Sequence, residues 1–154
     1  IALFKKELLP QFPHKEKVHI VEGNALTYIM AQEDGAFDYG FSDFWGGLSD
    51  GLPLYLSFAK GCARFRHTAH DYWIENTFID YYFRPAVMIF LMEKVLGRKE
   101  RPLDQGKKAS GILRKFISFL EKEPFTLEKE DDIYHLLDTK TLVRVVRKFA
   151  ASCL

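Results

Sequence analysis

The sequence has few cysteines, no long apolar run and almost no excess of charge of one sign. Its two cysteines, Cys62 and Cys153, lie far apart without paired spacing, which argues against a disulfide framework or a zinc cluster. No apolar run approaches the length of a membrane span. Lys and Arg total 22 against 21 Asp and Glu, so no global field attracts nucleic acid or an anionic membrane. These absences predict a cytoplasmic protein with no membrane partner, and no nucleic-acid partner is expected.

The composition is typical of one globular domain. The chain has 154 residues, of which 47% are hydrophobic and 15% aromatic, enough to build a core and too many for a disordered segment. It begins Ile-Ala-Leu-Phe-Lys-Lys, without an initiator methionine or a helix cap, as if inside a helix. We therefore expect residues of the native protein to precede Ile1.

The first part of the sequence alternates between helix and strand patterns. β-Branched residues in VHIVE and the alternation of Phe37, Tyr39 and Phe41 with polar residues indicate two short strands. Helix-forming patterns surround them, an order typical of an α/β unit. The predicted elements are a helix over 1–9, a strand over 18–22, a helix over 25–32, a strand over 37–43 and a helix capped by Asp50.

From Asp71 onward the patterns are helical. Asp71 is a capping candidate for a helix with a broad apolar face, and Pro85 should kink or divide that helix. Three more helices are predicted over 109–122, 129–137 and 139–150. We therefore expect an α/β region over 1–70 and a helical extension over 71–154, which packs on that region and is not an independent domain.

Two segments of the sequence resemble a known family. VHIVEGNA at 18–25 and FDYGFSDFW at 37–45 resemble the class I S-adenosylmethionine-dependent methyltransferases, a Rossmann-like group that includes spermidine synthase. The resemblance implies that Asn24 and Ala25 lie near the adenine of the cofactor. It also implies that Asp43 ends a strand beside the methionine part and the substrate, where it could act as a general base. Phe44 is then expected to contact the cofactor.

The same resemblance implies that part of the fold lies outside this sequence. The family's glycine-rich loop and its ribose-binding acid would precede Ile1, and the strands that carry them would separate the two strands predicted here. The fold class we expect is therefore α/β, an incomplete Rossmann-like methyltransferase sheet of few parallel strands with a helical C-terminal extension. Such a fragment should be inactive alone, because most polar contacts to the cofactor are missing.

Each candidate residue also has a purely structural interpretation. Asp43 suits the start of a glycine-rich turn, and Asn24 suits a helix cap. Phe44 and Trp45 could pack on their own domain instead of stacking on a ligand. Asp50, which resembles an acidic position of aminopropyl-transferring enzymes, is explained as well by capping.

Two further clusters are candidate sites. His67 and His70, near Cys62 and Asp71, are suitable metal ligands, but no second ligand pair is evident and we expect no metal. The basic residues around them could hold an anion, with Tyr72 and Trp73 as stacking partners, although a solvated linker between two helices is the simpler interpretation. These basic residues are Lys60, Arg64 and Arg66.

The function predicted from the sequence is the C-terminal portion of an S-adenosylmethionine-dependent methyltransferase acting on a small-molecule substrate. One alternative is a spermidine synthase-like aminopropyltransferase, which needs an acidic polyamine pocket. Another is a non-catalytic interaction domain that forms dimers or larger oligomers through the apolar face over 73–91. The aromatic residues of that face could equally belong to the core of the chain itself.

Overall fold

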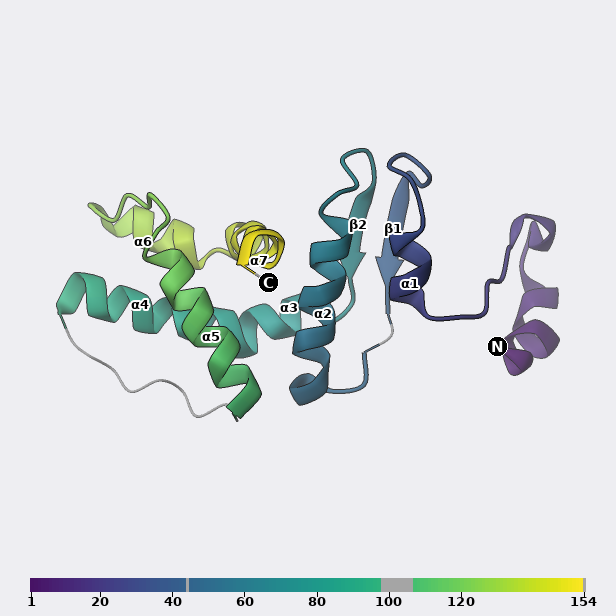
Figure 1. The fold of residues 1–154 in the computed structure, drawn as a ribbon, viewed down its shortest axis with the longest axis horizontal. Coiled ribbons are helices and arrows are strands. Elements are labelled where there is room, and N and C mark those ends of the chain that lie inside the picture. Colours follow the sequence, from purple (N-terminus) through teal and green to yellow (C-terminus); the bar gives the residue numbers. More distant parts are fainter. Residues whose placement is uncertain (44, 98–106, 154) are drawn as a thin grey trace. The chain divides into compact units, whose positions relative to one another are not determined.

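The computed structural model describes residues 1–43, 45–97 and 107–153, and the chain divides into two compact units, Ile1–Gln32 and Glu33–Leu154 (Figure 1). The first unit contains short helical turns and no buried side chain. Its elements are the π-helix η1 (Phe4–Leu8), the 3-10 turns η2 (Leu9–Gln11) and η3 (Lys15–Lys17), and helix α1 (Ala25–Met30).

The strand predicted over 18–22 is wrong. Residues 18–22 have no regular secondary structure, and no described residue of the first unit belongs to a strand. The β-branched residues of VHIVE favour extended backbone, but an isolated segment gains no ladder hydrogen bonds without a partner. Lys5 anchors the end of this segment, since its Nζ lies 3.0 Å from Oε1 of Glu22.

The second unit contains a small parallel sheet. Strand β1 (Tyr39–Ser42) leads through helix α2 (Leu48–Cys62) to strand β2 (Ala69–Tyr72), and the two strands pair in parallel, with Tyr39 opposite Ala69. The chain is therefore an α/β protein in which helices predominate (Figure 1). Strand β1 confirms the strand predicted over 37–43. Residue 70, the predicted end of the α/β region, lies inside β2.

Strand β2 corrects the prediction that Asp71 begins a helix. Asp71 pairs with Phe41 in the sheet, and helix α3 (Glu75–Phe78) begins only after a turn. A close contact between the two strands lies one position earlier, where Gly40 is opposite His70. A Cβ atom on Gly40 would lie 2.7 Å from Nδ1 of His70, so only glycine leaves room for the His70 ring here.

Asp50 is not the cap of α2. The helix begins at Leu48 with Gly47 as its N-cap, and Asp50 lies exposed in the first turn. A carboxylate in the first turn still favours the helix, because it faces the positive end of the helix dipole. The position of Asp50 is therefore explained by helix electrostatics, although the capping prediction is wrong.

The helices that follow match the sequence patterns closely. Pro85 does separate two segments, since the π-helix η4 (Ile79–Phe83) gives way to helix α4 (Arg84–Leu96) directly before it. The last three helices confirm those predicted over 109–122, 129–137 and 139–150 to within a few residues. They are α5 (Lys107–Leu120), α6 (Glu130–Leu137) and α7 (Thr139–Cys153).

Aromatic side chains form the core of the helical part. The ring centroid of Phe116 lies 4.9 Å from that of Phe83 and 5.3 Å from that of Phe149. These three side chains come from α5, η4 and α7 and are fully buried. Helix α7 also packs against α2, so it joins the core to the sheet (Figure 1).

The apolar face over 73–91 mostly serves this core. Phe78, Ile79, Phe83 and Val87 are fully buried within the unit, which confirms the core interpretation of this stretch. In the described part of the chain, no helix combines the length and the apolar character that crossing a membrane requires.

Candidate functional site

Asn24 and Ala25 lie at the start of α1. The Oδ1 atom of Asn24 accepts a hydrogen bond of 3.0 Å from the backbone N–H of Thr27, so the capping interpretation of Asn24 is confirmed. Ala25 is the first residue of the helix. Their proposed contact with adenine stays a prediction, and nothing in the first unit argues for it independently.

Asp43 directly follows β1. Its side chain is exposed at the carboxyl end of the parallel pair, the edge of an open α/β sheet at which ligands collect. Phe44 lies outside the described residues. Trp45 is packed, since its Nε1 donates to the Ser42 carbonyl at 3.2 Å and its ring centroid lies 6.1 Å from that of Tyr55. For Trp45 the packing interpretation is confirmed.

An open cavity of about 1090 Å³ lies at the same end of the sheet. One wall comes from the ends of β1 and β2 and the residues after them, and the other wall from the first turns of α7. Asp43 is outside the set of described residues that line it. The lining includes Phe41, Asp71, Trp73, Glu75, Asp138, Lys140, Arg144 and Arg147.

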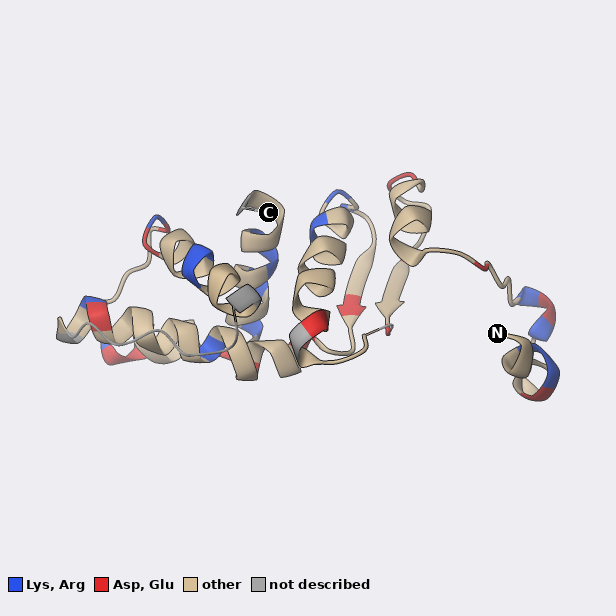
Figure 2. Cartoon of the chain, turned by 60° about the horizontal axis from the view of Figure 1, so that its bottom comes forward, with Lys and Arg blue, Asp and Glu red and all other residues tan. Residues whose placement is uncertain are grey.

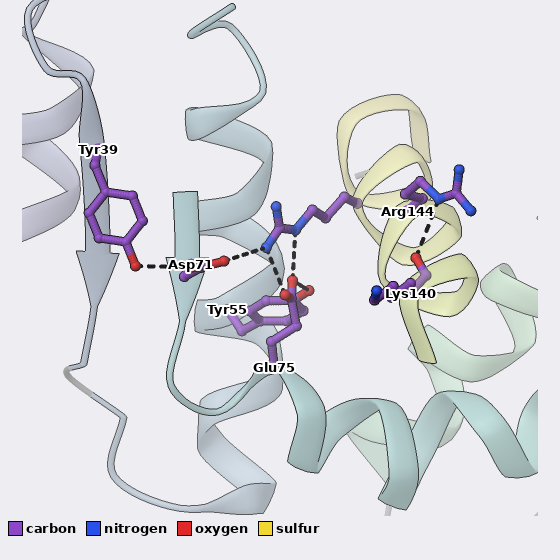
Figure 3. A network of polar contacts seen from close by, with 7 residues as sticks. Tyr39, Tyr55, Asp71, Glu75, Lys140 and Arg144 are labelled. Carbon is purple, nitrogen blue, oxygen red and sulfur yellow. Dashed lines mark hydrogen bonds and ion pairs between the residues drawn. The ribbon is translucent and has the colours of Figure 1, made fainter. Parts of the chain in front are cut away.

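A buried ion pair joins the two walls. The Glu75 side chain is 7% exposed, and Arg147 binds it through two hydrogen bonds, from Nε to Oε1 at 2.8 Å and from Nη2 to Oε2 at 2.7 Å. The Tyr55 hydroxyl donates to the same carboxylate at 2.6 Å (Figure 3). Such a bidentate pair fixes both distance and orientation, so α7 is held in register with the end of β2.

Asp71 extends this network to β1. Its Oδ2 accepts a hydrogen bond of 2.9 Å from the Tyr39 hydroxyl, and its Oδ1 lies 3.9 Å from Nη2 of Arg147 (Figure 3). The network therefore runs from β1 through β2 to α7. We refer to Tyr39, Tyr55, Asp71, Glu75 and Arg147 below as the strand-end network.

The network shifts the pKa of its members in consistent directions. Burial raises the pKa of Tyr55 well above its ordinary value, and the negative charge of Glu75 raises it further. Burial opposes the charge on Arg147, but its hydrogen bonds to Glu75 outweigh this effect and raise its pKa. Tyr55 thus stays a neutral donor and Arg147 a permanent cation at any physiological pH.

A second cavity of about 420 Å³ lies between the end of α2 and β2. Cys62 lines it as a buried free thiol whose pKa is raised by burial, so it is a neutral thiol and a poor nucleophile. His70 also lines it, and its Nε2 is buried without a hydrogen-bond partner among the described residues. No three His, Cys, Asp or Glu side chains of the described residues gather as a possible metal site.

The His70 environment predicts a pH dependence of stability. Burial, followed by the positive charge of Arg147, lowers the pKa of His70 below its ordinary value near 6.5. Because the unfolded chain then binds a proton more readily, stability should fall as the pH drops below about 6.5. Urea unfolding of the wild type and of His70→Phe at pH 7.5 and pH 5 measures this loss, which should be smaller in the variant.

A matched control uses an exposed histidine. His19 has an exposed side chain, so His19→Gln should lose stability on acidification as the wild type does. Equal losses for the wild type and His70→Phe would show that His70 does not carry the effect.

Two of the basic residues before β2 have partners within the fold. Arg64 places its guanidinium 4.5 Å above the Phe65 ring, and Nδ1 of His67 lies 3.0 Å from Oδ2 of Asp34. Their segment leads from a helix into a strand, which corrects the expected linker between two helices. The cation–π and ion-pair contacts fix this connection next to the sheet.

The sequence interpretation missed the strand-end network. Glu75 was the available signal, because an acid directly after the apolar residues Tyr72, Trp73 and Ile74 is out of place in an apolar run. Its partner Arg147 was not recognisable, since the two residues are 72 positions apart.

In comparisons with protein-family models, with curated proteins and with solved structures, no match to this chain was found. A function for this chain is therefore inferred from its fold and its cavity. They define an α/β protein with a ligand-sized opening beyond the carboxyl ends of two parallel strands.

Proposed function

We propose that this chain is part of an S-adenosylmethionine-dependent methyltransferase whose acceptor lies in the cavity at the ends of β1 and β2. The observation that carries the proposal is the position of that cavity, because open α/β sheets bind their ligands outside the carboxyl ends of parallel strands. The resemblance of FDYGFSDFW to the methyltransferases supplies the cofactor class.

Within this proposal Asp43 lies at the same edge of the sheet as the cofactor and the acceptor. It follows β1 directly, and the neighbouring Ser42 carbonyl accepts a hydrogen bond of 3.0 Å from the backbone N–H of Trp73, which ties the two strand ends together. Asp43 is thus held at the same edge as the cavity and can serve as a general base. Asn24, Ala25 and Phe44 keep their proposed roles as cofactor contacts.

Calorimetric titration with S-adenosylmethionine tests this proposal on the complete protein that contains this chain. Saturable heat and a higher melting temperature are expected. Asp43→Asn should weaken binding about tenfold, because a hydrogen bond to a charged group contributes about 1.5–3 kcal/mol. Asp50→Asn, in the exposed first turn of α2, is the matched control and should bind as the wild type does. No heat and no change in melting temperature would rule the proposal out.

The aminopropyltransferase alternative is less well supported. A polyamine needs unpaired carboxylates, whereas the carboxylates that line the cavity all have partners within the fold. Asp71 and Glu75 belong to the strand-end network, and Oδ2 of Asp138 accepts the backbone N–H of Thr141 at 3.0 Å. Tighter binding of decarboxylated S-adenosylmethionine than of the intact cofactor would reverse this preference.

The interaction-domain alternative has also lost its main support. It relied on a broad apolar face over 73–91, and the fully buried side chains of that stretch already pack inside the unit. A purely structural role would moreover leave the open cavity without an explanation.

A further inference from the structure

We propose that the cavity binds a nucleotide, with the base against Trp73 and Phe41 and the phosphate on Lys140 and Arg144. This names the acceptor class of the proposed methyltransferase and rests on that function for the transfer of the methyl group. The binding itself follows from charges and aromatic surfaces that do not depend on the cofactor.

The acidic and the basic residues that line the cavity differ in how many of them have partners. All three carboxylates have fold partners, and Arg147 is bound to Glu75. No carboxylate of the described residues lies within ion-pair distance of Lys140 or Arg144. Basic residues recur along α7 (Figure 2). The cavity therefore presents two cations that an anionic ligand can neutralise.

The geometry of these two cations suits a phosphate. Lys140 and Arg144 are one helical turn apart on α7, and both line the cavity. Arg144 donates a hydrogen bond of 3.4 Å to the Lys140 carbonyl of its own helix (Figure 3). It donates a second one, of 3.2 Å, to the Thr141 hydroxyl. An arginine suits the oxygens of a phosphate especially well, and a lysine adds a second charged donor.

The opposite wall of the cavity presents exposed aromatic surface. Trp73 is 69% exposed and Phe41 is 57% exposed, although both line the cavity. Trp45, by contrast, is partly buried among Tyr55 and Tyr72. Aromatic side chains left uncovered beside cations are the combination by which proteins hold nucleotides, since each base has a face that stacks.

The strand-end network keeps the two walls at a fixed separation. Arg147 lies one turn beyond Arg144 on α7 and is bonded to Glu75, two residues after Trp73. The cations and the aromatic wall are thus positioned before any ligand arrives. In a preorganised site of this kind, ordering the side chains on binding costs little free energy.

Calorimetric and tryptophan-fluorescence titrations with UMP and GMP test the proposal, because neither nucleotide carries adenine and so neither reports on an adenine pocket for the cofactor. Saturable quenching that weakens at high salt is expected. The double variant Lys140→Gln/Arg144→Gln should lose at least about tenfold in affinity, since it removes two charged hydrogen bonds. Trp73→Ala should also weaken binding.

Lys94→Gln/Lys115→Gln is the matched control, since it removes two exposed cations that do not line the cavity, and its affinity should be unchanged. The proposal is overturned if neither nucleotide binds, or if the Lys140 and Arg144 double variant binds as tightly as the wild type. Inorganic phosphate that binds as tightly as UMP would also overturn it, because the aromatic wall would then contribute nothing.

Two further titrations, with a single-stranded oligonucleotide and with S-adenosylmethionine, distinguish a free nucleotide from nucleic acid and this site from the cofactor site. A single-stranded oligonucleotide that binds far more tightly than UMP and GMP would overturn the assignment to a free nucleotide. UMP or GMP binding without S-adenosylmethionine binding would support this site and count against the methyltransferase. S-adenosylmethionine binding without UMP or GMP binding would overturn this site alone.

Discussion

Replacing Arg147 with methionine should lower the free energy of unfolding by about 3 kcal/mol, because removing one partner of a buried ion pair leaves the other charge uncompensated. Glu75 would keep only the hydrogen bond from Tyr55 in a site where its side chain is 7% exposed. Arg147 itself is 34% exposed, which places the effect at the lower end of the range measured for such pairs. Urea unfolding followed by circular dichroism measures the change.

Two companion variants separate the charge effect from lost packing. Arg144→Met changes the same residue type on the same helix where no carboxylate pairs with it, so it should cost no more than about 0.5 kcal/mol. Glu75→Met/Arg147→Met removes both charges together and should be less destabilising than Arg147→Met alone. A cost for Arg147→Met as small as that for Arg144→Met would contradict the proposed importance of the pair.

The Phe116→Ala substitution should be still more destabilising, at about 3–5 kcal/mol. Phe116 is fully buried and its ring lies near three others, with centroid distances of 4.9 Å to Phe83, 5.3 Å to Phe149 and 6.4 Å to Phe119. Truncation would leave a cavity where η4, α5 and α7 meet, and these fixed helices can close it only partly.

The melting temperature and the urea midpoint measure this effect. Phe41→Ala is the matched control, because that phenylalanine is 57% exposed and its loss should cost less than about 1 kcal/mol. Equal losses for the two variants would mean that the aromatic cluster does not form the core of the unit.

The sequence predicted those elements whose signals are local. The apolar periodicity of residues 139–150 and 109–122 corresponds to α7 and α5, and the alternation of Phe37, Tyr39 and Phe41 corresponds to β1. Such patterns depend only on neighbouring residues, so one chain is enough to read them.

The wrong predictions concern segments whose secondary structure depends on a partner that is distant in the sequence. VHIVE has stronger strand propensity than β2, whose sequence is Ala-His-Asp-Tyr, yet only β2 is a strand. β2 lies beside β1, and its His70 ring packs over Gly40, so tertiary pairing outweighs the weak local preference.

In the candidate site, too, the sequence predicted what depends on neighbouring residues and missed what depends on distant ones. Strand-end reasoning placed Asp43 correctly at the carboxyl edge of the sheet. It did not identify Glu75, Lys140, Arg144 or Arg147, because the cavity they line exists only where α7 packs near the sheet. Local sequence patterns do not predict a contact between residues so far apart in the chain.

The position of Arg147 so late in the chain also sets an order of events during synthesis. β1, α2 and β2 leave the ribosome well before α7, and the Glu75–Arg147 bonds span 72 residues. Contacts of such long sequence separation form only after the loop between them has closed. The nascent chain can therefore pair its strands early, while the cavity at the ends of β1 and β2 is completed as one of the last steps of folding.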